Sequence, residues 1–455
     1  MKKLITAATR SELALLLVAE GSMVTGGGAG GGESSGRGGS APRRARLRVV
    51  GVCLLLALAG MLYLGYFCPE HVCALTSRDL KETARITEPL LSGNTLGLRS
   101  NSLELEKNNF VPVHPAFKLQ SIPGSLGYDD FFLNDTLQFN ISAHDVIVFL
   151  HIQKTGGTLF GKHLVRDLDL TKPCTCQRRR KRCFCHRPYR KENWLFSRYS
   201  TGWKCGLHAD WTELTSCVDT ELNKIEGNNF KRRYFYITII RDPVARYLSE
   251  FRHVQRGATW KGARHWCGGT QANIPQCYPG INWQGVSLEE FMACPYNLAN
   301  NRQTRMLADL SLIGCYNSSL SPEERDRLML ASAKRNLKYM PFFMLTEYQK
   351  VGQYSFEETF KLRFAVAFEQ HNATLSAATM ATLTPGQLEA VQRLNKLDLE
   401  LYRFATDLAF QRFRRLRDRD PYFVQRFKHL GELPSRQSAT EFNWDSAVED
   451  TTDFD

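Results

Sequence analysis

Two short runs of consecutive apolar residues dominate the hydrophobic pattern of the chain. Residues 145–150 read DVIVFL, and residues 234–240 read YFYITII. A strand that is buried on both faces of a parallel sheet has such a continuous run, whereas a strand with one face in water alternates between apolar and polar residues. The pattern therefore predicts two buried strands at these positions.

Apolar residues at helical spacing follow the first run, over residues 158–167, and similar amphipathic patterns cover residues 323–337 and 387–417. Predicted strands thus alternate with predicted helices along the chain. This order indicates an α/β fold with a central, mostly parallel sheet that is flanked by helices.

A further helix is predicted after the second run, because Pro243 can occupy the first turn of a helix. This helix would place Ser249, His253, Arg256 and Trp260 on one side, since their spacings of four, three and four follow the helical repeat. The resulting face is polar and aromatic, unlike a face that packs into a core.

The N-terminal part of the chain has a different composition. Residues 24–40 are rich in Gly and Ser, so residues 1–48 are expected to form a disordered tail. Residues 49–68 carry no charge, and a helix of that length crosses the roughly 30 Å hydrocarbon core of a bilayer. Basic residues precede this segment, which places the N-terminus in the cytoplasm. We predict a single-pass type II membrane anchor.

The remainder of the chain would then be lumenal. We expect a stem at residues 69–142, a compact domain at residues 143–430 and an acidic tail at residues 431–455. Glycosylation sequons occur only after the anchor, which agrees with a lumenal location. These sequons are at Asn134, Asn140, Asn317 and Asn372.

Cysteine usage also indicates an oxidising compartment, because ten of the 13 cysteines lie between Cys174 and Cys315. Four of them lie with His186 in residues 174–186, a set that zinc could bind. Their C-x-C spacing differs from the C-x₂-C of a usual zinc knuckle. We therefore favour disulfides, with the pairing left open.

The loop after the first predicted strand, HIQKTGGT at residues 151–158, has the composition of an anion site. A strand, a glycine-rich turn and a helix N-terminus direct free backbone N–H groups to one point. Lys154 adds a cation, Gly156 and Gly157 allow close approach, and Thr155 and Thr158 offer hydroxyl donors. The lysine precedes the glycines, unlike in a Walker A loop. The alternative is a tight turn without a ligand.

The chain is basic, with a formal net charge of +13, and residues 178–182 read RRRKR. Arg187, Arg190 and Lys191 follow this run, and aromatic residues are interleaved with the cations. Such a mixture suits a polyanion. In a secretory compartment the common polyanion is a glycosaminoglycan, so no nucleic-acid partner is expected. A solvated basic loop is the alternative.

Four longer motifs, HIQKTGGT, GWKCGLHADWTEL, RDPVARYLSEFRHVQRGATW and CPYNLANNRQTRMLADL, occur in this order. With them, residues 145–417 resemble a heparan-sulfate 6-O-sulfotransferase. The resemblance implies a sulfotransferase-like, P-loop-related fold in the Golgi membrane. It also implies transfer of a sulfuryl group from 3′-phosphoadenosine 5′-phosphosulfate (PAPS) to the 6-hydroxyl of glucosamine in heparan sulfate.

For the donor, the resemblance implies that Lys154 lies beside the bridging oxygen, where negative charge develops on the leaving phosphate. Arg241 and Ser249 match positions that hold the 3′-phosphate. No metal would be needed, because lysine, arginine and the helix dipole neutralise the donor. The implied donor-binding residues are His151, Ile152, Gln153, Lys154, Thr155, Gly156, Gly157, Thr158, Leu159, Arg241, Ser249, Glu369, Gln370, His371, Leu375 and Ser376.

Residues 368–376 depart from the family pattern. Relatives carry an aromatic residue and an arginine near this segment, whereas this chain has His371 and Leu375. The difference would weaken donor binding.

For the acceptor, a general base must take the proton of the attacking hydroxyl. His208 matches the family's base, and imidazole suits the role because its ordinary pKa is near neutrality. His151 is the rival, although we interpret it as a donor ligand. The implied acceptor-binding residues are Lys181, Arg182, Arg198, Trp203, His208, His253 and Trp260.

Two other functions stay open from the sequence. The donor motifs do not exclude a sulfotransferase for another glycan, such as chondroitin sulfate. The second is a non-catalytic, glycosaminoglycan-binding membrane protein. Such a protein would not need Lys154, Arg241, Ser249 and His208 together, so their joint presence favours an enzyme.

Overall fold

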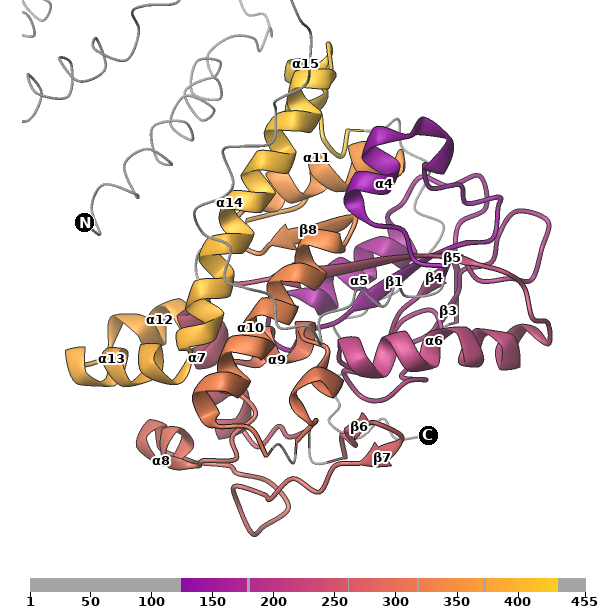
Figure 1. The fold of residues 1–455 in the computed structure, drawn as a ribbon. Coiled ribbons are helices and arrows are strands. Elements are labelled where there is room, and N and C mark those ends of the chain that lie inside the picture. The colour runs from indigo at the N-terminus through magenta and orange to yellow at the C-terminus, as the bar shows by residue number, and fades with distance from the viewer. Residues whose placement is uncertain (1–123, 178–180, 261, 317–318, 371–373, 433–455) are drawn as a thin grey trace, which may run out of the picture. The chain divides into compact units, whose positions relative to one another are not determined.

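A computed structural model describes residues 124–177, 181–260, 262–316, 319–370 and 374–432 (Figure 1). The predicted cytoplasmic tail, the anchor at residues 49–68, most of the stem and nearly all of the acidic tail lie outside these ranges. Within the ranges, no helix combines the length and the apolar character that a bilayer crossing needs.

A parallel four-stranded sheet forms the centre of the fold (Figure 1). In spatial order its strands are β4 (Leu195–Phe196), β1 (Asp145–Leu150), β5 (Arg233–Ile240) and β8 (Phe342–Leu345). Ile147 of β1 lies opposite Phe235 of β5, and all three pairings are parallel. The two predicted strands are confirmed as the inner pair of this sheet.

Helices make up most of the remaining secondary structure of the described residues. They are α4 (Tyr128–Leu133), α5 (Gly157–Arg166), α6 (Trp211–Glu226), α7 (Pro243–Gln255), α8 (Leu288–Ala293), α9 (Arg302–Leu307), α10 (Pro322–Tyr339), α11 (Gln349–Phe360), α12 (Leu375–Ala381), α13 (Pro385–Leu394), α14 (Lys396–Arg419) and α15 (Phe423–Lys428). The 3₁₀ turns are η2 (Asp135–Leu137) and η3 (Leu310–Ile313). Two small hairpins pair β2 (Thr175–Cys176) with β3 (Cys183–Phe184), and β6 (Trp266–Cys267) with β7 (Thr270–Gln271).

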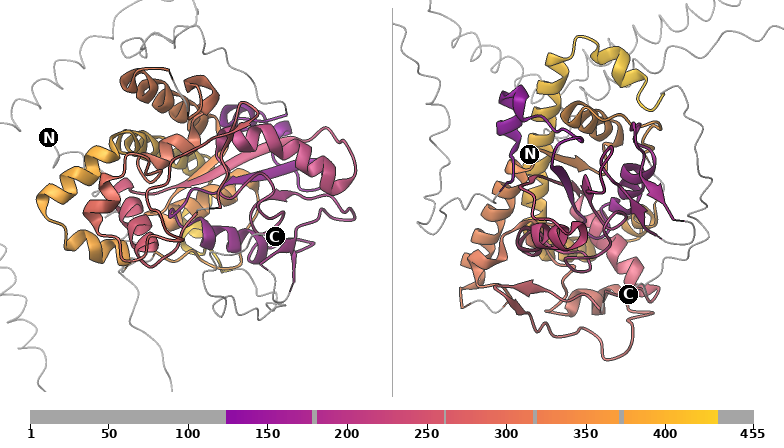
Figure 2. Two further views of the ribbon diagram at one scale, coloured as in Figure 1. Left: turned by 90° about the horizontal axis from the view of Figure 1, so that it is seen from below. Right: turned by 90° about the vertical axis from the view of Figure 1, so that its right-hand side faces the viewer.

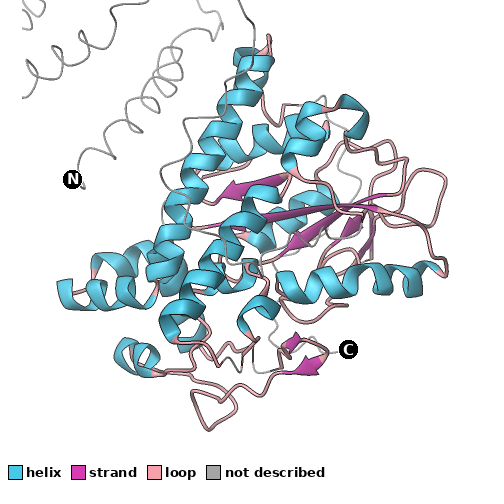
Figure 3. Ribbon diagram, in the orientation of Figure 1, coloured by secondary structure: helices cyan, strands magenta, loops and turns pink. Residues whose placement is uncertain are grey.

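The sheet lies between two layers of helices, as Figures 2 and 3 show. Val146, Val148 and Leu150 of β1 share a core with α6 and α10, whereas Ile147 and Phe149 share a second core with α5 and α11. Both faces of the strand are therefore apolar, which explains its continuous apolar run. The predicted α/β class is confirmed.

The pattern over residues 387–417 corresponds to two helices, which corrects the single amphipathic stretch read from the sequence. α13 ends at Leu394, and α14 begins at Lys396. Asn395 between them is buried, and its amide donates to the Val391 carbonyl at 2.9 Å. The apolar spacing continues across this break, so the pattern does not reveal it.

The helix predicted after Pro243 is shorter than expected. α7 ends at Gln255, and Gly257 just beyond it has a φ of 92°. Arg256 is the C-cap and Trp260 lies beyond the helix, so the prediction of one common helical face is wrong at Trp260. Its ring centroid still lies 5.2 Å from that of His253.

Residues 124–142, which the sequence assigns to the stem, pack onto the sheet. The Leu126 N–H donates to the Tyr234 carbonyl at 3.1 Å. Tyr128 and Phe139 are buried, and the Arg412 guanidinium lies 3.9 Å from the Tyr128 ring centroid. This part of the predicted stem thus contributes to the core.

The ten cysteines of residues 174–315 form five disulfides, which confirms the preference for disulfides over zinc. The pairs are Cys174–Cys185, Cys176–Cys183, Cys205–Cys217, Cys267–Cys315 and Cys277–Cys294. The third pair ties the loop that contains Trp203 and His208 to α6.

Candidate active site

Three segments that carry predicted site residues meet at the carboxyl edge of the parallel sheet. The loop that begins at His151 follows β1, Arg241 follows β5, and the segment with Trp203 and His208 follows β4. Ligands of open α/β sheets bind outside this edge, in the crevice between loops that lead away from neighbouring strands. The fold therefore brings three of the sequence motifs together.

The loop after β1 has the backbone shape of an anion site. Lys154 has a φ of 64°, and Gly156, the N-cap of α5, has a φ of 85°. Left-handed backbone turns the chain sharply before the helix and leaves the first N–H groups of α5 without partners within the helix. Thr155 is buried, and its hydroxyl donates to the Ile152 carbonyl within the loop at 3.0 Å.

The second glycine of this loop is required by packing. A Cβ on Gly157 would lie 2.6 Å from Nε2 of His151, which is too close for any side chain. His151 is buried and stacks on Phe149, with ring centroids 5.4 Å apart and planes at 9°. Gly157 thus lets α5 begin directly against the imidazole.

Arg241 joins the donor loop to the first turn of α12. One guanidinium nitrogen donates to the Lys154 carbonyl at 3.0 Å, and the other donates to the Ser376 hydroxyl at 2.7 Å. Burial lowers the pKa of Arg241 from its ordinary value, an effect that Glu347 opposes. The structure therefore brings together three of the predicted donor-binding residues.

The other predicted donor-binding residues of this region differ in their placement. The Gln370 amide lies 3.4 Å from the Thr346 carbonyl, while Glu369 and Leu375 are exposed. Ser249 is half-buried on α7, and α7 packs on α12. His371 lies outside the described residues.

His208 is buried, and its Nδ1 lies 2.9 Å from the His151 carbonyl oxygen. A carbonyl only accepts, so Nδ1 carries the hydrogen and Nε2 of the neutral ring holds the lone pair. The His208 ring lies near two indoles, with centroids 4.6 Å from Trp203 and 6.2 Å from Trp260. This tautomer leaves Nε2 as the nitrogen that can accept a proton.

Burial lowers the pKa of His208 to about 3. The hydrogen bond to the His151 carbonyl opposes this shift, and the charges of Arg198 and Arg302 strengthen it. Burial also lowers the pKa of His151 well below its ordinary value. Both imidazoles are therefore neutral at physiological pH, and a neutral ring is the form that a general base requires.

An open cleft of about 1640 Å³ lies beside the two indoles. Five of the predicted acceptor-binding residues line it, namely Lys181, Arg182, Arg198, Trp203 and Trp260. The guanidinium of Arg198 lies 5.3 Å from the Trp203 ring centroid, a cation–π arrangement. The cleft is thus lined by cations and aromatic faces, as an anionic sugar polymer would require. Arg178 to Arg180, in the basic run, lie outside the described residues.

The comparisons with known proteins agree with this geometry. Residues 137–405 match the Sulfotransferase family. Heparan-sulfate 6-O-sulfotransferase 2 of Danio rerio is 47% identical over 383 residues, which cover 81% of this chain and 79% of that protein. Heparan-sulfate 6-O-sulfotransferase 2 of Gallus gallus is 44% identical over 416 residues, with 87% and 96% covered. The chain belongs to the heparan-sulfate 6-O-sulfotransferase family. Heparan-sulfate 6-O-sulfotransferase 3 of Homo sapiens is 54% identical over 303 residues and 64% of each chain.

Two of the four predicted sequons lie within the described residues of the protein. Asn134 and Asn140 are both exposed, as a glycan-bearing asparagine must be. Asn317 and Asn372 lie outside the described residues.

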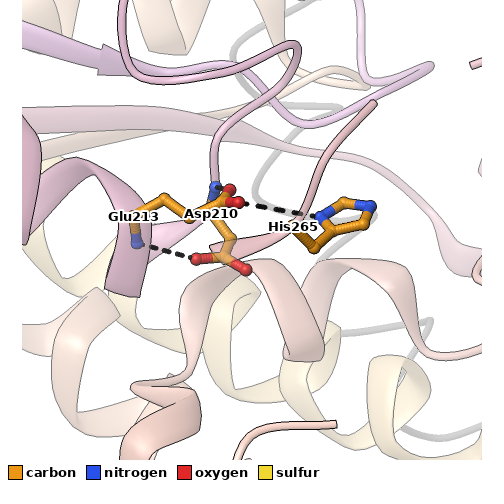
Figure 4. Close-up of side chains that lie close together, drawn as sticks. All are labelled: Asp210, Glu213 and His265. Atoms are coloured by element: carbon orange, nitrogen blue, oxygen red, sulfur yellow. Dashed lines mark hydrogen bonds and ion pairs between the residues drawn. The ribbon is translucent and has the colours of Figure 1, made fainter. Parts of the chain in front are cut away.

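Three buried titratable side chains, Asp210, Glu213 and His265, lie close together and were not predicted from the sequence (Figure 4). Asp210 caps α6 and accepts the Glu213 N–H at 3.0 Å. The Glu213 carboxylate accepts the N–H groups of Asp210 and Trp266, each at 2.8 Å. His265 Nδ1 lies 3.8 Å from the Glu213 carboxylate. A D-x-x-E capping box can be read from a sequence, but the approach of His265 cannot.

These contacts support a capping role for the cluster. Its ligand atoms lie within 4.8 Å of one another, a spacing that a metal ion could also use. However, the carboxylates already accept three backbone N–H donors, and the charge of Arg305 acts on the cluster. Burial raises the pKa of Asp210 to about 6. Burial, with Asp210 beside it, raises the pKa of Glu213 to about 8, so the two carboxyl groups retain a proton near neutral pH.

Proposed function

We propose that the chain transfers a sulfuryl group from PAPS to the 6-hydroxyl of glucosamine in heparan sulfate. One observation carries the proposal: the His208 ring is hydrogen-bonded to the backbone of the loop that contains Lys154. The proton acceptor and the proposed donor site are thereby joined at one edge of the sheet. Membership of the heparan-sulfate 6-O-sulfotransferase family supports the substrate class.

In this proposal, His208 takes the proton of the 6-hydroxyl at Nε2 while the hydroxyl oxygen attacks sulfur. The Nδ1–H bond to the His151 carbonyl keeps the required tautomer and orients the ring. The low pKa in the free protein keeps the ring neutral. Binding of the anionic donor and acceptor would raise that pKa, because nearby negative charge favours the imidazolium.

Lys154 then stabilises the negative charge that develops on the bridging oxygen as the bond from sulfur to the leaving phosphate breaks. The N-terminus of α5 adds backbone N–H donors at the same place. Arg241 and Ser249 would hold the 3′-phosphate. Since two nitrogens of Arg241 already donate to the protein, the phosphate would use the remaining N–H donors of its guanidinium.

The cleft lined by Trp203 and Trp260 would take the polymer, with Lys181, Arg182 and Arg198 facing its sulfate and carboxylate groups. His253, whose ring lies beside Trp260, would complete this acceptor-binding set. The two indoles beside His208 would confine the sugar whose hydroxyl reacts.

We further propose that residues 49–68 anchor the enzyme in the Golgi membrane, with the catalytic domain in the lumen. The five disulfides of the domain support an oxidising compartment. In sealed Golgi vesicles, the domain should resist added protease until detergent is present. Degradation without detergent would place the domain on the cytoplasmic side.

Transfer to heparan and chondroitin sulfate with labelled PAPS tests the substrate and the position of sulfation. We expect label in disaccharides that carry 6-O-sulfated glucosamine. Label only at other positions, or only in chondroitin sulfate, would contradict the proposal. An absence of transfer, with polymer binding retained, would favour a non-catalytic binding protein.

Replacing the base tests the mechanism. His208→Ala should reduce turnover by about 10²- to 10⁴-fold, because the proton acceptor is lost. Binding of 3′-phosphoadenosine 5′-phosphate, measured by calorimetry, should stay near the wild-type value, since no proposed phosphate ligand is removed. Near-wild-type turnover of this variant, together with an inactive His151→Ala variant, would assign the base to His151 instead.

A further inference from the structure

One motif of the chain, CPYNLANNRQTRMLADL, contains a short helix whose polar side chains are nearly all buried. In α9, Arg302, Gln303, Thr304 and Arg305 are each at most 6% exposed. Polar and charged side chains are rarely buried unless they bind specific partners. The partners of this helix therefore indicate what it does.

The start of α9 is fixed to the long helix α14 by one carboxylate. Asp398 accepts the N–H of Gln303 at 3.0 Å and the N–H of Thr304 at 2.7 Å. The Thr304 hydroxyl donates to the same carboxylate at 2.7 Å. Asp398 is fully buried, so this attachment is shielded from solvent. α9 is thus a rigidly held element between α14 and the candidate site.

Arg302 is directed toward the acceptor cleft, and both Arg302 and its partner Glu250 line that cleft. The Arg302 guanidinium binds the Glu250 carboxylate through two nitrogens, one at 2.8 Å. It also lies 5.5 Å from the ring centroid of Trp260. The charges of Arg302 and Arg246 lower the pKa of Glu250 to about 2, although burial alone would raise it. This buried ion pair therefore holds the Arg302 guanidinium in place against the Trp260 indole.

Gln303, the next residue, is directed toward the donor site. Its amide oxygen accepts the Arg241 N–H at 2.8 Å, and its amide nitrogen donates to the Arg241 carbonyl at 2.9 Å. A single side chain thus holds both polar groups of the residue whose guanidinium contacts the Lys154 carbonyl. Because successive helical residues point about 100° apart, one short helix can serve two sites.

We propose that α9 positions both substrates, with Gln303 acting on the donor through Arg241 and Arg302 acting on the acceptor through Trp260. Both are positioning residues, since neither is expected to touch the reacting atoms. Arg302 requires arginine, because a lysine cannot bind a carboxylate through two nitrogens. Gln303 requires an amide, because one group must both accept and donate. The inference rests on the proposed function, because it assigns the donor to Gln303 and the acceptor to Arg302.

Steady-state kinetics of two conservative variants test the proposal. Gln303→Leu should raise the KM for PAPS about tenfold and leave the KM for heparan sulfate within about twofold, because only the donor side loses its support. Arg302→Lys should do the reverse by a similar factor. If Gln303→Leu does not fold, Gln303→Glu serves instead. It keeps an acceptor for the Arg241 N–H, but it loses the donation to the Arg241 carbonyl and adds a negative charge on the donor side, so it should also weaken PAPS binding selectively.

Thr304→Val is the matched control. It removes a hydrogen bond from the same helix but contacts neither site, so it should lower the melting temperature without changing the ratio of the two KM values. If both KM values changed in parallel in all three variants, α9 would only stabilise the fold, and the proposal would be overturned. Unchanged KM values in the Gln303 and Arg302 variants would overturn it as well.

Direct binding separates this inference from the proposed function. Affinities for 3′-phosphoadenosine 5′-phosphate and for a heparan sulfate oligosaccharide do not depend on turnover or on the position of sulfation. The Gln303 variant should lose affinity for the nucleotide only, and the Arg302 variant for the oligosaccharide only. A wild-type protein that binds both ligands but sulfates another position would contradict the proposed function. The separate roles of Gln303 and Arg302 could still be tested by the binding measurements.

Discussion

Arg241 shows how one residue can support both binding and chemistry. From sequence, its role is to hold the donor's 3′-phosphate, so its loss should chiefly weaken donor affinity. In the structure its guanidinium also donates to the carbonyl of Lys154, a residue with a left-handed backbone. Without this contact, the proposed catalytic ammonium would lose part of its support. Arg241 is therefore expected to affect turnover too.

Variants of these two residues separate the two effects. Lys154→Ala should reduce turnover at saturating PAPS by about 10²- to 10³-fold, because it removes stabilisation of the leaving group. Arg241→Ala should raise the KM for PAPS and also lower turnover at saturation, by a smaller factor. Arg256→Ala, at an exposed position just after α7, is the control. If Lys154→Ala changed only the KM for PAPS, its role in the transition state would have to be abandoned.

Among the elements, α6 links the fold to the candidate site, and we expect its stability to depend on pH. Its capping box, formed by Asp210 and Glu213, follows His208 closely, and the raised pKa of Glu213 keeps that carboxyl group protonated at neutral pH. The folded state raises the pKa of Glu213 from 4.5 to about 8, so the native protein binds more protons than the unfolded chain over that range. Its contribution to stability is full below the unfolded pKa and is lost as pH rises toward 8.

Thermal unfolding between pH 6.5 and 8 should reveal this loss. Burial lowers the pKa of His265 from 6.5 to about 3. The effect of His265 on stability therefore changes with pH below 6.5, outside this window. The wild-type melting temperature should decline over this window more steeply than that of Glu213→Gln, which cannot ionise. Glu221→Gln, further along α6 and paired with Lys224, is the control and should keep the wild-type slope. Equal slopes in all three proteins would show that Glu213 is already ionised.

The elements also show what local sequence can predict. β1 and β5 were predictable because burial on both faces leaves an unbroken apolar run. β4 has two residues and β8 has four, too short for such a signal. The break at Asn395 depends on tertiary contacts, since its side chain accepts the Asn301 N–H from another part of the fold.

The same limit applies to the candidate site. Lys154, Arg241 and His208 lie in motifs whose order could be read from the chain, and all three lie at the carboxyl edge of the sheet. Arg302 binds Glu250, which is 52 residues away, and Gln303 binds Arg241, which is 62 residues away. No local pattern marks them, although charged and amide residues within buried helices are a signal once burial is known.

For the molecule as a whole, we expect the distribution of charge to control how a polyanion is captured. Cations gather at the cleft, where Lys181, Arg182 and Arg198 line the wall next to the indoles. A polymer that binds there should release counterions, as nucleic acids do when they bind basic proteins. Arg178 to Arg180 immediately precede Lys181 in sequence and would add long-range attraction rather than register.

Replacing Arg178, Arg179 and Arg180 together with alanine should therefore weaken heparan sulfate binding and flatten its dependence on salt. Turnover at saturating acceptor should stay within a few-fold of wild type, because the residues that line the cleft are retained. The control replaces Arg403, Arg414 and Arg417, three exposed arginines of α14, which removes the same charge away from the cleft lining. The slope of log Kd against log salt should fall more in the first variant than in the second. Equal slopes would mean that only net charge matters, and an unchanged slope in the first variant would mean that these arginines are simply solvated.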